Sequence, residues 1–161
     1  MALLELKNLK TFFATKRGTV KAVNGVSYSL DAGKVLGVVG ESGSGKSVSA
    51  MSILRLLDGN GYIDSGEILF NGVDLTKLSM NEMYKIRGNE ISVIFQEPMT
   101  SLNPVFTVSR QISEPLMIHQ GMTKKQAAVK AIELLSDVKI PNPEVVAKQY
   151  PHQLSGGMRQ R

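Results

Sequence analysis

A glycine-rich segment that follows an apolar run constrains the fold of this chain more than any other feature. The run is Val35-Leu36-Gly37-Val38-Val39, and the residues after it match the pattern G-x-x-x-x-G-K-[ST]: Gly40, Glu41, Ser42, Gly43, Ser44, Gly45, Lys46 and Ser47. A continuously apolar run is typical of a strand covered on both faces in a parallel sheet. Beyond the loop, residues 47–57 predict a helix with one apolar stripe, formed by Ala50, Ile53, Leu54 and Leu57. Strand, turn and helix together predict a phosphate-binding loop.

The residue types in this loop suit a nucleoside triphosphate and Mg²⁺. Glycines let the backbone wrap closely round an anion, and the helix that follows adds the positive end of its dipole. Lys46 would reach the β- and γ-phosphates, and the hydroxyl of Ser47 would bind Mg²⁺. The alternative is a glycine-rich turn that binds nothing.

Composition limits the class of protein. The 161 residues are enough for about one domain, with 42% hydrophobic residues and no cysteine. The apolar runs are far shorter than the ~20 residues of a membrane span, and Glu5 stands where a signal peptide would carry basic residues. We therefore expect a cytosolic protein. The net charge of +5 comes from scattered side chains, so we expect solvated faces rather than a functional basic surface.

Several shorter patterns predict the remaining elements. Alternating apolar and polar residues indicate an antiparallel region in residues 3–30 and a strand in 66–70, followed by an Asn71-Gly72 turn. Residues 91–95 read as a second buried strand. Capping boxes at Ser79 and Thr123 predict helix starts, and Gly88 should stop the first of these helices. Residues 108–138 should be helical, with Pro115 starting or kinking the first helix and an apolar stripe on the second: Ala128, Ala131, Ile132 and Leu135.

A second glycine motif and a proline-rich stretch carry a family resemblance. The chain ends in Leu154-Ser155-Gly156-Gly157-Met158-Arg159-Gln160-Arg161, and residues 93–104 read VIFQEPMTSLNP. With the first loop, these stretches resemble the nucleotide-binding subunits of ABC (ATP-binding cassette) transporters, in the branch that imports dipeptides, oligopeptides or nickel. The resemblance implies an α/β fold of the P-loop NTPase class, with an N-terminal antiparallel β region and a helical subdomain.

The same resemblance implies roles for individual residues. Gln96 would contact Mg²⁺ and the attacking water, and Phe13 would stack on adenine with Ala22 beside it. Ser155, Gly156 and Gly157 would cap the γ-phosphate of an ATP held by a partner subunit. Each has a simpler alternative: a solvated glutamine, a core aromatic residue and a plain helix N-cap, respectively. His119 and His152 are expected to be structural or exposed.

The resemblance also implies that residues 1–161 are the N-terminal part of one domain. Residues 1–95 would form the β region and P-loop core, and residues 96–161 the Q-loop, helical subdomain and signature motif. In this family an apolar strand ending in Asp-Glu supplies the general base, and a switch histidine follows it. Neither pattern occurs here. We therefore expect a protein cut within the helix of the signature motif, which is the second glycine motif at Ser155, Gly156 and Gly157. Such a chain would have open sheet edges and would hydrolyse little ATP on its own.

The expected function is that of an ATP-hydrolysing subunit that energises peptide import from the inner face of the cell membrane. Its expected partners are a second ABC ATPase subunit, membrane permease subunits and, indirectly, an extracytoplasmic peptide-binding protein. Two alternatives remain open: a soluble ABC-type ATPase acting on nucleic acid, and a nucleotide-binding fragment without turnover. The first usually carries a long coiled-coil insertion or basic linker, and residues 46–155 contain neither. The transported solute and the choice between homodimer and heterodimer cannot be read from the residues.

Overall fold

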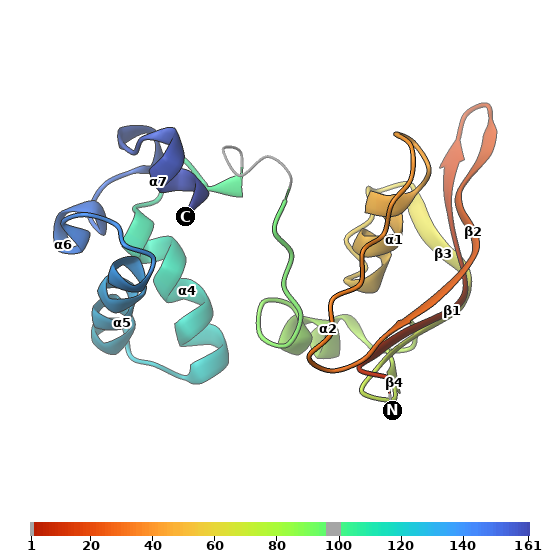
Figure 1. Ribbon diagram of the computed structural model, residues 1–161, viewed down its shortest axis with the longest axis horizontal. Coiled ribbons are helices and arrows are strands. Elements are labelled where there is room, and N and C mark those ends of the chain that lie inside the picture. The colour runs from red at the N-terminus through yellow and green to blue at the C-terminus, as the bar shows by residue number, and fades with distance from the viewer. Residues whose placement is uncertain (1, 96–100) are drawn as a thin grey trace. The chain divides into compact units, whose positions relative to one another are not determined.

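The computed structural model describes residues 2–95 and 101–161, which form two compact units, Met1–Tyr84 and Lys85–Arg161 (Figure 1). Among the described residues, no helix has the length and apolar character needed to span a bilayer.

The first unit is built on a four-stranded antiparallel sheet. Its strands are β1 (Leu4–Thr15), β2 (Gly18–Leu30), β3 (Gly61–Phe70) and β4 (Val73–Asp74), in the order β2-β1-β3-β4. Leu6 of β1 faces Tyr28 on β2 and Ile68 on β3, which fixes the register at the centre of the sheet. The antiparallel region predicted for residues 3–30 is confirmed. The strand predicted for residues 66–70 is also confirmed, and it begins earlier, at Gly61.

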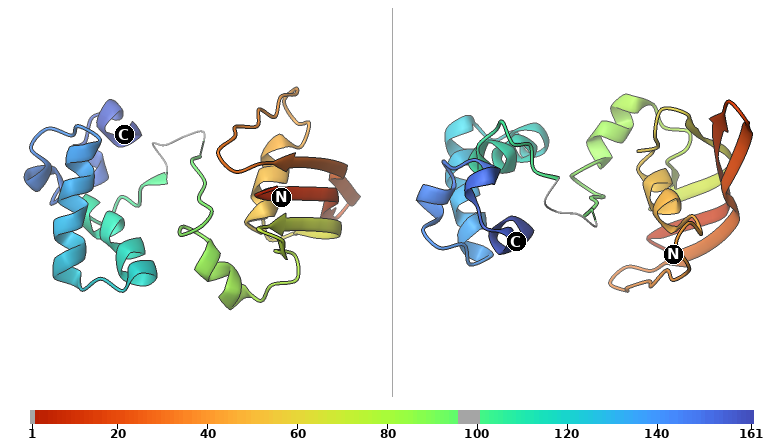
Figure 2. Two further views of the ribbon diagram at one scale, coloured as in Figure 1. Left: turned by 60° about the horizontal axis from the view of Figure 1, so that its bottom comes forward. Right: turned by 90° about the horizontal axis from the view of Figure 1, so that it is seen from above.

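Helix α1 (Lys46–Ile53) lies against one face of this sheet (Figure 2). The hydroxyls of Thr11 on β1 and Ser52 on α1 are 2.9 Å apart and share a buried hydrogen bond. The apolar side chains buried in this unit come from the sheet, from the end of the helix and from the segments that follow: Leu6, Leu9, Val23, Leu54, Ile68 and Leu75. The helix that follows the glycine-rich loop is therefore fixed directly on the β region.

The buried face of α1 differs from the predicted stripe. Ser49 and Ser52 are buried, whereas Ala50 is exposed and Ile53 only partly buried. Burial of the two serines is inexpensive because their hydroxyls donate to helix carbonyls, Ser49 to Lys46 at 2.8 Å and Ser52 to Val48 at 2.7 Å. The helix also ends at Ile53 rather than Leu57, because Arg55 takes a left-handed conformation with φ +52°.

The two strands predicted from continuous apolar runs do not form. Residues 35–39 pair with no strand among the described residues, and Val35 and Val39 are 98% and 92% exposed. Residues 91–95 have only an isolated bridge between Ile91 and Arg87, and Ile94 is 95% exposed. A strand needs a ladder of hydrogen bonds to a neighbouring strand, and among the described residues neither segment has one.

Local turn and cap signals are confirmed. Asn71 and Gly72, with φ +48° and +81°, make the tight turn between β3 and β4. Helix α2 (Met80–Ile86) begins at the predicted capping box: the Ser79 amide donates to Glu82 Oε2 at 2.8 Å, and the Glu82 amide donates to Ser79 Oγ at 3.3 Å. Gly88 follows the helix with φ +75°.

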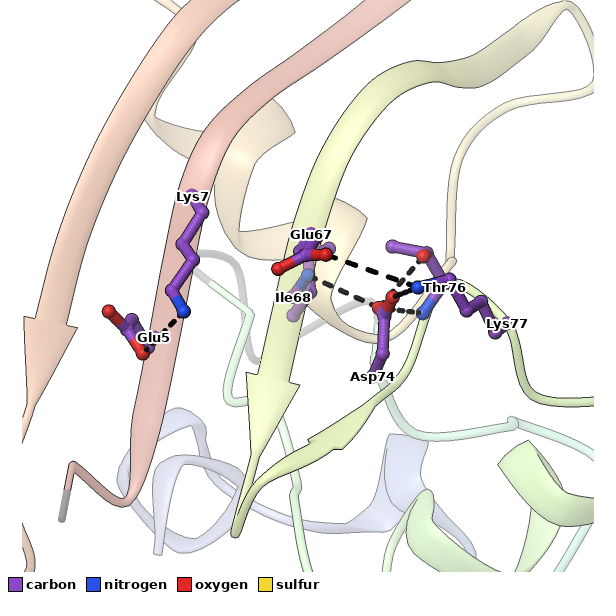
Figure 3. A network of polar contacts seen from close by, with 7 residues as sticks. All are labelled: Glu5, Lys7, Glu67, Ile68, Asp74, Thr76 and Lys77. Carbon is purple, nitrogen blue, oxygen red and sulfur yellow. Dashed lines mark hydrogen bonds and ion pairs between the residues drawn. The ribbon is translucent and has the colours of Figure 1, made fainter.

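Asp74 ties the β3–β4 hairpin together (Figure 3). Its Oδ1 accepts hydrogen bonds from the Thr76 amide at 3.0 Å, the Thr76 hydroxyl at 2.8 Å and the Ile68 amide at 3.4 Å. Its Oδ2 lies 2.9 Å from the Lys77 ammonium, which also approaches Glu67 at 4.0 Å. Burial raises the pKa of Asp74, but the Lys77 ion pair and the hydrogen bonds from Thr76 and Ile68 outweigh it and hold the pKa below 3.8.

The second unit is helical. It contains α4 (Val108–Gln120), α5 (Lys124–Asp137), α6 (Pro143–Val146), the 3₁₀ turn η1 (Pro151–Gln153) and α7 (Gly156–Gln160). Its buried core joins several of these elements and consists of Val108, Leu135, Ile140, Val146, Ala147 and Leu154.

The predicted helical span in residues 108–138 is confirmed, with two differences. Helix α4 begins at Val108, so Pro115 lies within the helix and does not start it. The capping box of α5 forms as expected, since the Thr123 amide donates to Gln126 Oε1 at 2.9 Å. On α5 the fully buried stripe is Ala127, Ala131 and Leu135, while Ala128 and Ile132 are only partly buried. Ala131 and Leu135 of the predicted stripe are therefore buried as expected, and Ala127 rather than Ala128 completes the buried face.

Candidate functional site

The glycine-rich loop of residues 40–47 is held against β2. Gly45 caps the start of α1 with φ +88°, a left-handed conformation that favours glycine. A Cβ on Gly45 would overlap the carbonyl oxygen of Ala22 and lie 3.5 Å from a methyl group of Val23. Glycine at this position therefore allows the loop backbone to rest directly on the strand, and Ala22 meets the loop through its main chain.

The ammonium group of Lys46 folds back over the loop. Its Nζ donates to the carbonyl oxygen of Gly40 at 2.6 Å and to that of Glu41 at 2.7 Å, and it lies 3.4 Å from the hydroxyl of Ser44. The Ser44 amide closes the turn by donating to Glu41 at 3.2 Å. The lysine charge is thus held among oxygen atoms of the loop that carry no net charge.

The other amides of the loop are unsatisfied. Within residues 2–95 and 101–161, the amides of Ser42, Gly43, Gly45, Lys46 and Ser47 make no hydrogen bond. The Ser47 hydroxyl is exposed and has no partner there either. Successive free N–H groups beside a lysine, at the start of a helix, form a concave set of donors suited to an anion with several oxygens.

The residues fit a Mg²⁺ ion bound together with phosphate oxygens. Mg²⁺ in such sites takes few protein ligands, and the free hydroxyl of Ser47 can be one of them. The described residues contain no group of three or more His, Cys, Asp or Glu side chains that could hold a metal alone. Gln96, the second predicted metal contact, lies outside the described residues, so its role stays a prediction.

Phe13 lies on β1, paired with Val20 on β2 and with Gly61 on β3. Its ring is directed over β3, since Cε1 is 2.7 Å from the position that a Cβ on Gly61 would take. The ring is only partly buried. Among the predicted site residues, the structure therefore brings Ala22 to the loop, while the described contact of Phe13 is with Gly61.

The second glycine motif forms a helix start in the second unit. Ser155 is the N-cap of α7, and its hydroxyl accepts a hydrogen bond from the Met158 amide at 3.3 Å. Ser155, Gly156 and Gly157 are all exposed. This geometry is that of an ordinary N-cap, and a role in contacting nucleotide stays a prediction. His152 is exposed and stacks on Tyr150 with ring centroids 5.7 Å apart, and His119 is partly buried.

Comparison with known proteins gives the family. The family described as "ABC transporter" matches residues 23–161. The oligopeptide transport ATP-binding protein OppD of Bacillus subtilis (strain 168) is 52% identical over 99% of this chain and 45% of its own length. The dipeptide transport ATP-binding protein DppD of Lactococcus lactis subsp. cremoris (strain MG1363) is 52% identical over 98% of this chain and 46% of its own length. The chain belongs to the ABC transporter family.

Solved structures agree with this assignment. The dimeric structure of MJ0796, described as a bacterial ABC transporter cassette, has a TM-score of 0.81 at 26% identity, over 98% of this chain and 65% of that one. A post-hydrolysis dimer of the same cassette, bound to ADP and Pi, has a TM-score of 0.79. The predicted fold, an ABC-type cassette with an N-terminal antiparallel region and a helical subdomain, is confirmed. The chain spans about half the length of the curated relatives it matches.

Proposed function

We propose that this chain is the nucleotide-binding part of an ATP-hydrolysing subunit that energises the import of peptides across the cytoplasmic membrane. The observation that carries the proposal is the set of unpartnered amides in residues 42–47 beside Lys46. Among proteins of this family, the relatives at about 50% identity are named for oligopeptide or dipeptide transport. A solved neighbour of similar fold is bound to ADP and Pi.

In this proposal the residues of the chain bind and orient the nucleotide. The free amides of residues 42–47 would donate to the β- and γ-phosphates, and Lys46 would exchange its carbonyl partners for phosphate oxygens. Ser47 and Gln96 would hold Mg²⁺, which when bound neutralises charge on the phosphates. Phe13 would stack on the base, with Ala22 holding the loop in place.

The remaining parts of the proposal concern organisation and partners. Residues 1–95 would supply the β region and nucleotide core of one domain, and residues 96–161 its Q-loop and signature-bearing helical part. Ser155, Gly156 and Gly157 would contact the nucleotide of a second ABC ATPase subunit, as the dimeric neighbours support. Membrane permease subunits, and through them an extracytoplasmic peptide-binding protein, would complete the assembly on the inner face of the membrane. Hydrolysis would need a general base and a switch histidine from outside these 161 residues.

Nucleotide binding is tested by calorimetric titration of the chain with ATP and Mg²⁺. The Lys46→Ala variant should bind at least ~10-fold more weakly, because a charge-assisted hydrogen bond contributes ~1.5–3 kcal/mol. Lys34→Ala is the matched control, since Lys34 is an exposed lysine outside the loop, before residues 35–39, whose side chain has no partner among the described residues. Equal affinities of the Lys46→Ala variant and the unmodified chain would contradict the proposal.

Peptide import is tested with a chimera in which the remaining half of the Bacillus subtilis OppD protein follows Arg161. We expect the chimera to restore growth on an oligopeptide in a strain of that bacterium that lacks OppD, and the same chimera with Lys46→Ala to fail. ATP hydrolysis by the purified chimera serves as the control for folding. A chimera that hydrolyses ATP and restores no growth would contradict the import proposal while leaving nucleotide binding intact.

A further inference from the structure

Helix α1 is attached to the sheet at two points. At its start, Gly45 rests against the carbonyl oxygen of Ala22 on β2. Near its end, the hydroxyl of Ser52 lies 2.9 Å from that of Thr11 on β1. Thr11 and Ser52 are both 0% exposed. The first attachment holds the glycine-rich loop, whereas nothing in the proposed nucleotide chemistry uses the second.

The direction of the hydrogen bond between the two hydroxyls follows from their other partners. Ser52 has one hydroxyl hydrogen, and it is donated to the carbonyl oxygen of Val48 at 2.7 Å. The hydrogen between the two hydroxyls therefore belongs to Thr11, which donates to Ser52. Because Ser52 already has a partner within its own helix, the bond from Thr11 is not needed to satisfy it. What the bond adds is a direct link between the strand and the helix.

The strand end of this link lies close to Phe13, the residue proposed to stack on the base. Around Thr11 the pairing skips Ala22 on β2 and Asp64 on β3, so the two irregularities lie on the neighbouring strands and β1 itself runs regularly. Side chains alternate along a regular strand, so Thr11 and Phe13 share a face.

The contacts of the Phe13 ring agree with this placement. The position that a Cβ on Gly61 would take lies 2.7 Å from Phe13 Cε1 and 3.0 Å from Cβ of Leu57, in the segment that follows α1. The ring therefore lies on the side of the sheet that carries the helix, as the hydroxyl of Thr11 does.

The link between Thr11 and Ser52 connects the two parts of the proposed nucleotide site. Phe13 is two residues from Thr11, a span of roughly 7 Å along a strand. Lys46 is six residues from Ser52, a span of roughly 9 Å along a helix. A ligand that must reach both Phe13 and the loop binds more tightly when their spacing is fixed before it arrives, because less freedom is lost on binding.

We propose that Thr11 and Ser52 are positioning residues for the nucleotide. Their hydrogen bond holds Phe13 at a fixed spacing from the amides of residues 42–47, and so favours ligands that carry a base as well as a polyphosphate. The assignment rests on the proposed function, which gives the phosphates to residues 42–47 and the base to Phe13.

The test compares the affinities of the chain for ATP and for tripolyphosphate, each with Mg²⁺, by calorimetric titration. Tripolyphosphate carries the phosphate groups without a base, so the ratio of the two affinities reports the positioning. Thr11→Val removes the hydroxyl and keeps the shape, at a strand position that suits valine. It should weaken ATP binding about threefold to tenfold, the range of one hydrogen bond, and leave tripolyphosphate binding unchanged. Thr11→Ser keeps the hydroxyl and should keep the ratio.

The helix offers a matched control. Ser49 is a second buried serine of α1, and its hydroxyl donates to the Lys46 carbonyl at 2.8 Å without reaching a strand among the described residues. Ser49→Ala should leave the ratio unchanged, whereas Ser52→Ala should lower it as Thr11→Val does. A variant that merely unfolds more easily loses its sites for both ligands together, so its ratio stays the same. Melting temperatures measure that effect separately.

A double substitution tests the dependence on Phe13 without tripolyphosphate. Phe13→Ala should weaken ATP binding, and Thr11→Val added to it should weaken ATP binding no further, because no base contact remains to be positioned. Unchanged ATP affinity in Phe13→Ala, or a full additional loss in the double variant, would overturn the assignment.

The remaining outcomes separate this assignment from the proposed function. Equal weakening of both ligands by Thr11→Val, unchanged ATP affinity in that variant, or an equal change of the ratio in Ser49→Ala would overturn the positioning role. If Lys46→Ala still weakened ATP binding, nucleotide binding by the loop would stand. Absence of ATP binding to the unmodified chain would contradict both.

Discussion

The strands of the antiparallel sheet and the apolar segments 35–39 and 91–95 contrast sharply in environment. Leu6, Leu9 and Ile68 on β1 and β3 are at most 1% exposed, because each strand has a hydrogen-bonded neighbour and a helix or loop covers one face. Val35, Val39 and Ile94 are at least 92% exposed, although their segments are more continuously apolar. Apolar character alone therefore does not make a strand; a pairing partner within the same fold is also required.

The comparison is tested most strongly by one substitution in each environment within the first unit. Val23→Ala, at a side chain that is 3% exposed, should lower the free energy of unfolding by about 1.5–3 kcal/mol. Val35→Ala, at a side chain that is 98% exposed, should change it by less than about 0.5 kcal/mol. Urea unfolding of both variants measures the difference. Equal losses would show that residues 35–39 are buried in solution and would break the comparison.

The contact between the glycine-rich loop and β2 is tested by substituting alanine for each of two glycines that have similar backbone angles. Gly43 and Gly45 have φ +81° and +88°, so alanine at either position carries left-handed strain of about 1 kcal/mol. Only at Gly45 does the added Cβ overlap Ala22; at Gly43 it meets nothing within 4 Å. Gly45→Ala should therefore destabilise the first unit by about 1–2 kcal/mol more than Gly43→Ala, measured by thermal unfolding. Identical losses would mean that the loop does not rest on the strand.

The smallest expected effect on stability comes from the β3–β4 hairpin, and the size of this effect depends on pH. The pKa of Asp74 is lower in the folded chain than its ordinary value of 3.8, so its ionised form stabilises the fold. That stability is fully present above about pH 5 and is lost as the pH falls through 3.8 toward the lower folded pKa.

Asp74→Asn should therefore cost about 1 kcal/mol at pH 7 and much less near pH 3, as measured by urea unfolding at several pH values. Asp58→Asn, at an exposed aspartate in the turn before β3, is the control and should show no such dependence. An Asp74→Asn effect that is constant from pH 7 to pH 3 would contradict the role given to the ionised carboxylate.

The sequence predictions were accurate for features that depend on neighbouring residues. They failed for features that depend on residues far away in the chain. The caps at Ser79 and Thr123 and the Asn71-Gly72 turn were predictable because each is complete within four residues or fewer. The missing strands at residues 35–39 and 91–95 were not, because pairing depends on distant residues. The prediction of which face of α1 is buried was wrong. The hydroxyls of Ser49 and Ser52 donate hydrogen bonds to helix carbonyls, so these two side chains can be buried against the sheet.

The residues of the candidate site could likewise be predicted only where a local sequence pattern marks them. The glycine-rich loop was predictable from its spacing, and the structure adds the reason for Gly45, the contact with Ala22. The anchoring role of Asp74 was missed; its position two residues before Thr76, after a tight turn, was the available signal.

In the function proposed for this chain, the backbone amides of residues 42–47 bind the polyphosphate of a nucleotide. Titrating the isotopically labelled chain with ATP and Mg²⁺, followed by amide NMR signals, tests it most directly. We expect saturable shifts that are largest for residues 42–47 and absent on addition of sodium chloride of equal ionic strength. Amide signals of residues 42–47 that stay unchanged at saturating ATP would contradict it.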